Sequence, residues 1–424
     1  MALAALLVFA CLALCNTQDL FRPLEFSSEE KEAAKGKTAL VTGAAGFIGS
    51  HVARHCRDLG MTVLAMDDLS GGFQSNVPPG VTFIQGDIKD AELLDDIFKK
   101  HKIHFVYHLA AYAAEGLSHF IRSYNYRTNL VASVEILNQA VKHKIECFVF
   151  TSSIAVYGSI NDLSQMQNPN RSLSTSGHKP KEDAKSSDVK GLSEKDRPTP
   201  EDPYGIAKYA FELDLHAARE LFGLDFVVFR PHNVYGPHQN MFDKYRNVAG
   251  IFINQIFHGQ PMTVFGSGEQ VRAFSYIDDV APPIARGPLV PRARNEIFNV
   301  GADQPYTVNE LADAIAEAMG SPGHPRDLQP ARMEVEVAVS NHDKVKEYFP
   351  ASEPIALKQG LQKTVEWYKD QGKLFRPVEF ASVEIMEQMP PSWVRPDLTE
   401  TAVCKGSRVQ TEAIDADQRP KIEL

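Results

Sequence analysis

The sequence predicts an α/β fold built on a doubly wound parallel sheet, followed by a smaller α+β region. Short apolar runs of strand length alternate with longer stretches of helical periodicity, which is typical of βαβ units. A glycine-rich turn joins the first such strand to the first such helix. The chain has 424 residues, 43% of them hydrophobic, so it is long enough to bury a large core in two lobes.

The first predicted unit is a strand at 38–41, a glycine turn, and a helix from about 47 to 59. The turn has the spacing G-x-x-G-x-x-G. In this context the glycines permit a tight turn, close approach of a pyrophosphate, and close packing of helix on strand. The start of the helix favours phosphate through its free N–H groups and partial positive charge. The dinucleotide contacts predicted here are Gly43, Gly46, Phe47, Ile48 and Gly49.

The next strands place further cofactor contacts at their carboxyl ends. The run 62–66 ends in Asp67-Asp68, and an acid there accepts hydrogen bonds from the adenosine ribose and repels a 2′-phosphate. This favours NAD over NADP, with Asp67 as the predicted ligand and Asp68 as the alternative. Strands are also predicted at 81–85 and 105–109. The contacts predicted at their ends are Asp87, Ile88, Leu109, Ala110 and Ala111.

A fifth predicted strand, 147–150, ends in Thr-Ser-Ser at 151–153, at the edge where ligands bind to a parallel sheet. A helix then begins at Pro203 and carries Tyr204 and Lys208, which are four residues apart and share one face. In isolation this pair would be an exposed helix pair. The glycine turn and the serines favour catalysis instead.

The chemistry expected of these groups is removal of a hydroxyl proton together with hydride transfer to NAD. Bringing the pKa of a tyrosine from about 10 to neutrality needs roughly 4 kcal/mol of stabilisation of the phenolate. The Lys208 ammonium, the helix N-terminus and the nicotinamide charge are expected to contribute to it. Ser153 holds the hydroxyl and Tyr204 is the base. The predicted catalytic residues are Ser153, Tyr204 and Lys208, and Ser152, Tyr204 and Lys208 are also predicted to contact the cofactor.

Six segments together resemble the extended branch of the short-chain dehydrogenase/reductase superfamily, and within it NAD-dependent nucleotide-sugar epimerases similar to UDP-glucose 4-epimerase. The segments are TGAAGFIGSH from Thr42, HLAA from His108, FTSSIAVYG from Phe150, PYGIAKYAFE from Pro203, FRPHNVYGP from Phe229 and RAFSYIDDVA from Arg272. The resemblance implies a Rossmann-type domain, predicted at 37–230, and a smaller α+β sugar-nucleotide region, predicted at 231–370.

The resemblance also implies ligand roles. Asn129 corresponds to an asparagine near the cofactor and substrate phosphates, and Asn233 to one that contacts the sugar nucleotide. Arg272 corresponds to an arginine that grips the diphosphate, which suits a planar bidentate donor, and Arg332 to a second phosphate or ribose ligand. The implied substrate residues are Ser153, Asn233, Arg272 and Arg332, and no metal-ligand spacing is present.

The reaction implied is epimerisation at C4 of a UDP-sugar through a transient 4-keto intermediate, with UDP-glucose and UDP-galactose as the expected pair. Dehydratases and decarboxylases of this branch place an acid, and 3,5-epimerases a cysteine, near the position where this chain has Ile154-Ala155. UDP-glucuronate, UDP-xylose and UDP-N-acetylhexosamine are the alternative substrates. A net nucleotide-sugar dehydrogenase is the alternative reaction, and a non-catalytic NAD-binding module is the alternative class.

Charge and the two chain ends bear on partners and compartment. The net charge of −10 argues against nucleic acid, and after a signal is removed no run would span a membrane. Residues 1–15 resemble a secretory signal peptide, and the ending Lys-Ile-Glu-Leu is one substitution from an ER retrieval signal. We therefore expect the lumen of the endoplasmic reticulum, with the cytoplasm as the alternative. Residues 16–36 and 371–424 are predicted extensions.

Two further expectations concern the surface. Residues 161–197, rich in Ser, Lys, Asp, Asn and Pro, are predicted to be a disordered loop inserted into the first domain. The family resemblance implies a homodimer formed by the Tyr204 helix and the helix at 129–143. Apolar side chains on the first of these helices permit such a face: Leu213, Leu215, Ala217, Ala218, Leu221 and Phe222.

Overall fold

The computed structural model describes residue 22 and residues 24–159, 191–332, 334–350, 353–371 and 383–394. The predicted signal sequence, the Lys-Ile-Glu-Leu ending and most of the 161–197 insertion lie outside these residues. A first compact unit runs to Glu387, and a second, from Gln388, contributes one short described helix, α14 (Pro391–Val394). None of the helices in the described ranges combines the length and apolar character needed to cross a bilayer.

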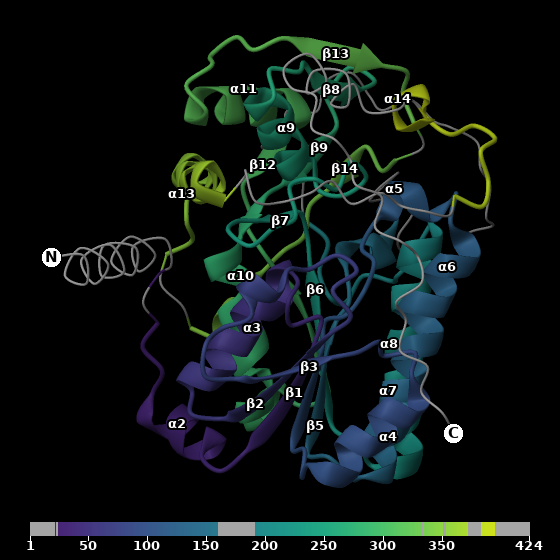
Figure 1. Ribbon diagram of the computed structural model, residues 1–424, viewed down its shortest axis with the longest axis vertical. Helices are drawn as coiled ribbons and strands as arrows, with labels where there is room; N and C mark the ends of the chain where they lie inside the picture. The colour runs from purple at the N-terminus through teal and green to yellow at the C-terminus, as the bar shows by residue number, and fades with distance from the viewer. Residues whose placement is uncertain are drawn as a thin grey trace, which may run out of the picture. The chain divides into compact units, whose positions relative to one another are not determined.

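A seven-stranded parallel sheet forms the centre of the first unit (Figure 1). Its strands lie in the order β11-β6-β5-β4-β1-β2-β3, and each neighbouring pair is parallel. The chain leaves β1 in one direction to β2 and β3 and then crosses to β4 on the other side, which creates the switch point where ligands bind. The doubly wound sheet predicted from the sequence is therefore confirmed. The strands are β1 (Thr38–Thr42), β2 (Thr62–Asp67), β3 (Thr82–Gln85), β4 (Phe105–His108), β5 (Cys147–Thr151), β6 (Phe226–Pro231) and β11 (Glu296–Val300).

Helices cover both faces of this sheet (Figure 1). Helices α3 and α10 pack on each other at one face, and α4, α7 and α8 at the other. The helices of these two layers and their neighbours are α2 (Ser28–Ala34), α3 (Phe47–Asp58), α4 (Ala91–Lys100), α5 (Glu115–Ser118), α6 (Arg122–Tyr126), the π-helical turn η2 (Arg127–Val131), α7 (Ala132–Lys142), α8 (Pro203–Phe222) and α10 (Ile277–Arg286), with 3₁₀ turns η1 (Gln74–Asn76), η3 (Ile154–Tyr157), η5 (Gly287–Leu289) and η6 (Pro291–Ala293).

The core lies on both sides of the sheet, which explains the continuous apolar runs of its strands. In β1, Ala39 and Val41 point into the core beneath α3, whereas Leu40 joins the core beneath α4, α7 and α8. Every residue of β4, β5 and β6 is buried. Successive side chains of a strand therefore point alternately into the two cores, one on each face of the sheet.

The residues after β6 build the smaller lobe and also supply the edge strand β11. That strand pairs with β6 and stacks Phe298 on Phe229, with ring centroids 5.5 Å apart. Three small sheets, β10-β7, β12-β9-β14 and β13-β8, make up the lobe. Its elements are β7 (Val234–Tyr235), α9 (Val248–Phe257), β8 (Met262–Phe265), β9 (Val271–Ala273), β10 (Ser275–Tyr276), β12 (Pro305–Thr307), α11 (Val308–Ala318), β13 (Arg326–Gln329), β14 (Val337–Ala338), α12 (Asp343–Tyr348) and α13 (Leu357–Gln371).

The end of the predicted 161–197 loop is held firmly in this fold. Leu192 is buried, its N–H donates to the Val339 carbonyl, and its own carbonyl accepts from the Asn341 N–H. The Glu194 carboxylate accepts a 2.7 Å hydrogen bond from the backbone N–H of Asn299. For residues 191–197 the prediction of a disordered loop is wrong, because one apolar side chain in a polar segment reaches the core.

Candidate active site

A cavity of about 500 Å³ lies at the carboxyl ends of the central strands and extends to the smaller lobe. All but one of the residues predicted to bind cofactor or substrate line it. They are Gly43, Gly46, Phe47, Ile48, Gly49, Asp67, Asp87, Ile88, Leu109, Ala110, Ala111, Ser152, Ser153, Tyr204, Lys208, Asn233, Arg272 and Arg332. The cavity therefore brings together residues spread over most of the chain.

The glycine turn between β1 and α3 has no room for side chains. A Cβ atom at Gly43, where φ is +71°, would lie 2.8 Å from the Ala110 nitrogen, and one at Gly49 would lie 2.0 Å from the Gly43 carbonyl oxygen. Glycine is thus required at both positions. No side chain caps the start of α3, which leaves its first N–H groups available to an anion.

The acid expected to bind a ribose is fixed beside this turn. Asp67 accepts hydrogen bonds from the backbone N–H groups of Ala45 (3.0 Å) and Leu69 (2.8 Å). Burial raises the pKa of its carboxyl, and these hydrogen bonds act in the opposite direction. The alternative, Asp68, turns away to the backbone and hydroxyl of Ser70. Asp67 is the better placed of the two to meet a ligand above the glycines.

Three hydroxyls mark the cavity as a site for a polar ligand. Thr128 Oγ1, Thr151 Oγ1 and Ser152 Oγ are buried and find no hydrogen-bond partner among the described residues, although all three residues line the cavity. Buried hydroxyls are normally paired. Together with the glycine turn and the Asp67 carboxylate, they fit a dinucleotide.

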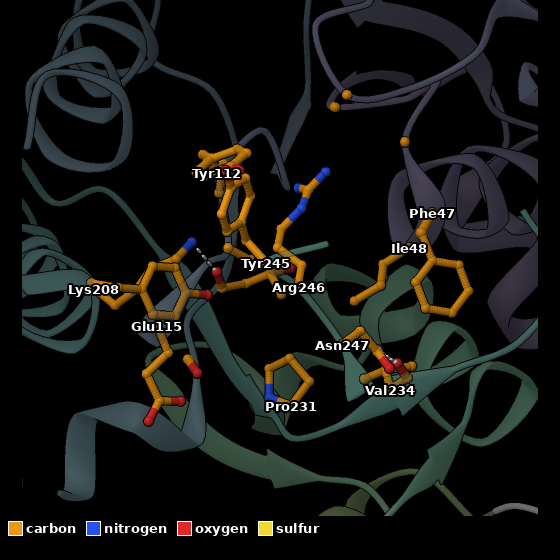
Figure 2. Close-up of a pocket in the computed structure, with 18 of the residues that line it drawn as sticks. Phe47, Ile48, Tyr112, Glu115, Lys208, Pro231, Val234, Tyr245, Arg246 and Asn247 are labelled. Atoms are coloured by element: carbon orange, nitrogen blue, oxygen red, sulfur yellow. Dashed lines mark hydrogen bonds between the residues drawn. The ribbon is translucent and has the colours of Figure 1, made fainter. Parts of the chain in front are cut away.

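The predicted catalytic residues converge at the same edge of the sheet. Asp202 caps α8 by accepting a 2.9 Å hydrogen bond from the Gly205 N–H, which sets the first turn where Tyr204 lies. Lys208 Nζ donates to the Thr151 carbonyl (2.8 Å; Figure 2) and lies 5.8 Å from the centre of the Tyr204 ring. Ser153 is the N-cap of η3, where its hydroxyl accepts from the Ala155 N–H (3.1 Å), and it lines the cavity together with Tyr204.

Burial dominates the electrostatics of this group. It raises the pKa of the Tyr204 phenol, while the nearby Ser153 hydroxyl acts in the opposite direction. It lowers the pKa of the Lys208 ammonium to about 7, against the charge of Glu212. Burial therefore opposes the lowering of the Tyr204 pKa expected from Lys208, the helix N-terminus and nicotinamide together, which stays a prediction. A phenolate here needs a further positive charge at the cavity, such as that of nicotinamide.

Two arginines face the cavity from the smaller lobe. Arg272 on β9 donates to the carbonyls of Val271 (2.8 Å) and Glu336 (3.1 Å), and burial lowers its pKa. Arg332 donates to the Glu334 carboxylate (3.2 Å), which also lies 3.8 Å from Arg272. Two guanidiniums thus share the Glu334 carboxylate, and planar donors of this kind suit a diphosphate.

The two predicted asparagines have different surroundings. Asn233 lines the cavity, and its amide donates to the Ala273 carbonyl (3.2 Å). Asn129 does not line the cavity. Its side chain accepts from the N–H of Tyr112 (2.9 Å) and donates to the Tyr112 carbonyl (3.0 Å), so it holds the loop after β4 from behind.

The sequence analysis missed several cavity residues. Glu115, the first residue of α5, lines the cavity, and its side chain is exposed. Figure 2 shows it together with Tyr112, Tyr245, Arg246 and Asn247. The last three lie in a segment that carries no recognisable motif. Only the position of Glu115, shortly after the fourth strand, gave a signal.

The fold and the residues that line the cavity are those of an NAD-binding enzyme of the extended short-chain dehydrogenase/reductase type. A model described as the NAD dependent epimerase/dehydratase family matches residues 39–301, and the chain belongs to that family. The predictions of an enzyme and of NAD as its cofactor are confirmed.

Relatives and solved structures agree with this membership. A putative UDP-glucose 4-epimerase of Methanocaldococcus jannaschii is 30% identical over 79% of this chain and 99% of its own length. The UDP-glucose 4-epimerase of Thermotoga maritima, solved with UDP-glucose, superposes with a TM-score of 0.67 at 32% identity, covering 79% of this chain and 99% of its own. The Thermus thermophilus UDP-glucose 4-epimerase, solved with NAD, gives 0.66 at 29% identity over 78% and 99%.

Other relatives carry different names at similar identity. A UDP-glucuronate 4-epimerase of Thermodesulfobacterium geofontis is 27% identical over 80% of this chain and 98% of its own length. A dTDP-glucose 4,6-dehydratase of Streptomyces niveus is 28% identical over 80% and 95%. Similarity alone therefore leaves the sugar and the reaction within the family open.

Proposed function

We propose that the protein is a UDP-hexose 4-epimerase that interconverts UDP-glucose and UDP-galactose. The observation that carries the proposal is the convergence of Ser153, Tyr204 and Lys208 in a cavity that Arg272 and Arg332 also line from the smaller lobe. Such a lining suits a sugar at the catalytic group and a diphosphate at the arginines. Bound NAD supplies a hydride acceptor and donor, so no co-substrate is consumed.

The residues divide the work between proton transfer and anchoring. Ser153 binds the C4 hydroxyl, and Tyr204 takes its proton during oxidation and returns it during reduction. Lys208, held by the Thr151 carbonyl, keeps positive charge near the Tyr204 oxygen. Arg272 and Arg332 hold the diphosphate while the 4-keto sugar turns over and presents its other face.

A 4,6-dehydratase is the second candidate, and Glu115 is the observation that favours it. Water elimination needs an acid at the sugar, and Glu115 offers a carboxyl group in the cavity lining. Against it, Ile154 and Ala155 supply no acid directly after β5. The two reactions differ in product mass, so one assay separates them.

The test is incubation of the purified protein with UDP-galactose, without added NAD, followed by chromatography and mass spectrometry of the sugar nucleotides. The proposal expects an equilibrium mixture with UDP-glucose of unchanged mass. A product lacking one water would indicate the dehydratase, and accumulation of NADH with an oxidised sugar the dehydrogenase. Conversion of UDP-glucuronate, UDP-xylose or UDP-N-acetylglucosamine alone would contradict the proposed substrate.

We also propose a homodimer that pairs α8 and its neighbour α7 with the same helices of a second copy. Leu213, Leu221 and Phe222 on α8 are 53%, 75% and 61% exposed, an unusual density of bare apolar side chains. Leu215 and Ala218 face the protein's own core instead, so their inclusion in the predicted face is wrong.

Light scattering should give twice the chain mass, and Leu213→Glu with Leu221→Glu should give the monomer. A monomeric parent protein would contradict the proposal.

Residence in the lumen of the endoplasmic reticulum is proposed from the two chain ends, which lie outside the described residues. Removing the final four residues, 421–424, should release the protein into the medium if the run at 1–15 directs translocation. Cell fractionation that finds the complete chain in the cytosol would contradict this compartment.

A further inference from the structure

The segment between β7 and α9, residues 236–247, crosses the cleft to the half of the fold that carries the glycine turn; we call it the strap. At its start, His51 of α3 contacts the Pro237 carbonyl (3.0 Å), and Ser50 bonds the His238 ring (3.0 Å). Further along, the Asn240 amide donates to the Gly71 carbonyl (3.3 Å). The strap belongs to the smaller lobe in sequence but is tied to the Rossmann-type half.

The loop to which the strap is tied packs directly on the glycine turn. A Cβ atom at Gly72 would lie 2.5 Å from the Ala45 carbonyl carbon and 2.7 Å from the Gly46 nitrogen. The Asn76 amide donates both to the Ala45 carbonyl (3.1 Å) and to the His238 carbonyl of the strap (3.2 Å). The strap therefore lies close to the place where α3 offers its N-terminus to a pyrophosphate.

Arg246, near the end of the strap, has a guanidinium that faces the N-terminus of α3. Arg246 is held by Asp243, whose carboxylate accepts from Nε at 2.6 Å, and by the ring of Tyr112, 4.7 Å from the guanidinium carbon. In Figure 2 its head group extends between Tyr112 on one side and Ile48 and Phe47, the first residues of α3, on the other.

The nitrogens of Arg246 that remain are directed to the cavity. Nη2 lies 3.1 Å from the position that a Cβ atom at Gly71 would take, and both residues line the cavity. Within the described part of the chain, the hydrogen bond to Asp243 uses Nε alone, so both Nη groups keep their donors. A planar guanidinium held in place, with both Nη groups free to donate, has the geometry that matches a phosphate bidentately.

We infer that Arg246 binds the pyrophosphate of the dinucleotide from the side opposite the glycine turn, and that the strap slows release of the cofactor. The negative charge of the pyrophosphate then lies between the N-terminus of α3 and the Arg246 guanidinium. Inside the cleft the electrostatic attraction from each of these groups is stronger than it would be in solvent. A diphosphate also occurs in a sugar nucleotide, so the cofactor and the substrate are the two sources to be separated. The inference rests on NAD as the cofactor of the family and not on the identity of the sugar.

The test compares binding by the parent protein, Arg246→Ala and Arg246→Lys, with Arg292→Ala as the control at a surface arginine outside the cavity. We expect the alanine variant to lose about 10- to 100-fold in affinity for NAD and for ADP-ribose. Affinity for adenosine, which has no pyrophosphate, stays the same, as does affinity for UDP. The lysine variant is intermediate because it keeps the charge and loses the fork. Purified Arg246→Ala protein should also carry less NAD.

Two results would overturn the inference. Unchanged affinity for NAD and ADP-ribose in Arg246→Ala would exclude the contact, and a loss confined to UDP would assign the guanidinium to the substrate. A fall in adenosine affinity with a lower unfolding temperature would mean collapse of the strap, and would equally count against a specific contact. Asn240→Ala tests the strap itself: it should speed NAD release without removing any phosphate ligand, and an unchanged release rate would contradict retention.

Discussion

Tyr204 and Lys208 form only a weak general base without the positive charge of the cofactor. Burial pushes both side chains toward their neutral forms, raising the pKa of the phenol and bringing that of the ammonium to about 7. At pH 7 the phenol is then protonated and the ammonium only partly charged, so the pair alone is a weak base. Positive charge supplied with the cofactor favours the phenolate, so proton removal is coupled to occupancy of the nicotinamide position.

Tyr204→Phe should therefore abolish turnover while leaving the site assembled. The ring is kept and only the hydroxyl is removed, so we expect kcat to fall by about 10²- to 10⁴-fold. Steady-state conversion of UDP-galactose measures the loss, and UDP affinity serves as the control because UDP has no contact with the hydroxyl in the proposed arrangement. Near-normal turnover would place the base elsewhere and would favour a non-catalytic role for the pair.

At the level of single residues, the sequence predicts best where one motif carries one function. Gly43 and Gly49 were predicted because the spacing of the glycines is a pattern within one short segment. Glu115 and Arg246 were not, because each reaches the cavity from a segment whose path is set by distant contacts. Asn129 illustrates the opposite error, since a position next to the site in the chain proves to support it from behind.

Helix α8 ties the catalytic side chains to two buried acids, one at each side of its first turns. Asp202 caps the helix, and Glu212, one turn beyond Lys208, pairs with Arg230 through hydrogen bonds of 3.0 Å to Nε and 2.5 Å to Nη2. Arg230 also donates to the Tyr157 hydroxyl (2.7 Å). The helix is thereby anchored at the residues that flank Tyr204 and Lys208.

The cap predicts a pH-dependent difference between two variants. Burial and the charge of Glu115 raise the native pKa of the Asp202 carboxyl above its unfolded value of about 3.9. The native state then binds the proton more tightly, so the parent protein loses stability relative to Asp202→Asn as pH rises from about 4 through the native pKa. Below that window the two should differ least.

Urea unfolding at several pH values measures this difference. Asp202→Ala is the matched control, because asparagine keeps the cap whereas alanine loses it, at a cost of about 1 kcal/mol at every pH. A difference between the parent protein and Asp202→Asn that does not change with pH would contradict the raised pKa.

The buried pair gives a second prediction for α8. Glu212→Gln leaves the Arg230 charge without its partner in a dry environment, and we expect the free energy of unfolding to fall by about 3–5 kcal/mol. The double variant Glu212→Leu with Arg230→Met removes both charges and should recover most of that loss. Denaturant unfolding of both proteins is the measurement. Equal losses in the two would show that shape, not the unpaired charge, sets the stability.

The molecule as a whole is not built as two consecutive halves. Strand β11, from the part of the chain predicted as the sugar-nucleotide region, completes the sheet beside β6, and the strap reaches back to α3 and the loop at Gly71. Local periodicity located the first five strands of the sheet, because each lies in one short window. It did not locate β11, whose place depends on pairing across a large separation in sequence.

A fragment ending at Arg230, the predicted domain boundary, should therefore fail to fold well. It would expose the edge of β6 and the face of Phe229 that β11 covers, which is a template for aggregation. A chain ending at Glu387, the limit of the first compact unit, is the control and should remain monodisperse. Circular dichroism and light scattering compare the two, and a cooperative thermal transition in the short fragment would contradict the expectation.

Order of synthesis gives the strap one more consequence. The glycine turn, Asp67 and the serines after β5 are synthesised before residues 236–247, but the sheet is complete only once β11 has emerged. We expect cofactor to be loaded most readily as the chain folds, before the strap has closed against α3. Protein made in cells short of nicotinamide should then take up added NAD slowly after purification, whereas Asn240→Ala protein should take it up quickly. The strap would make the supply of a small metabolite during translation a determinant of how much finished enzyme a cell obtains.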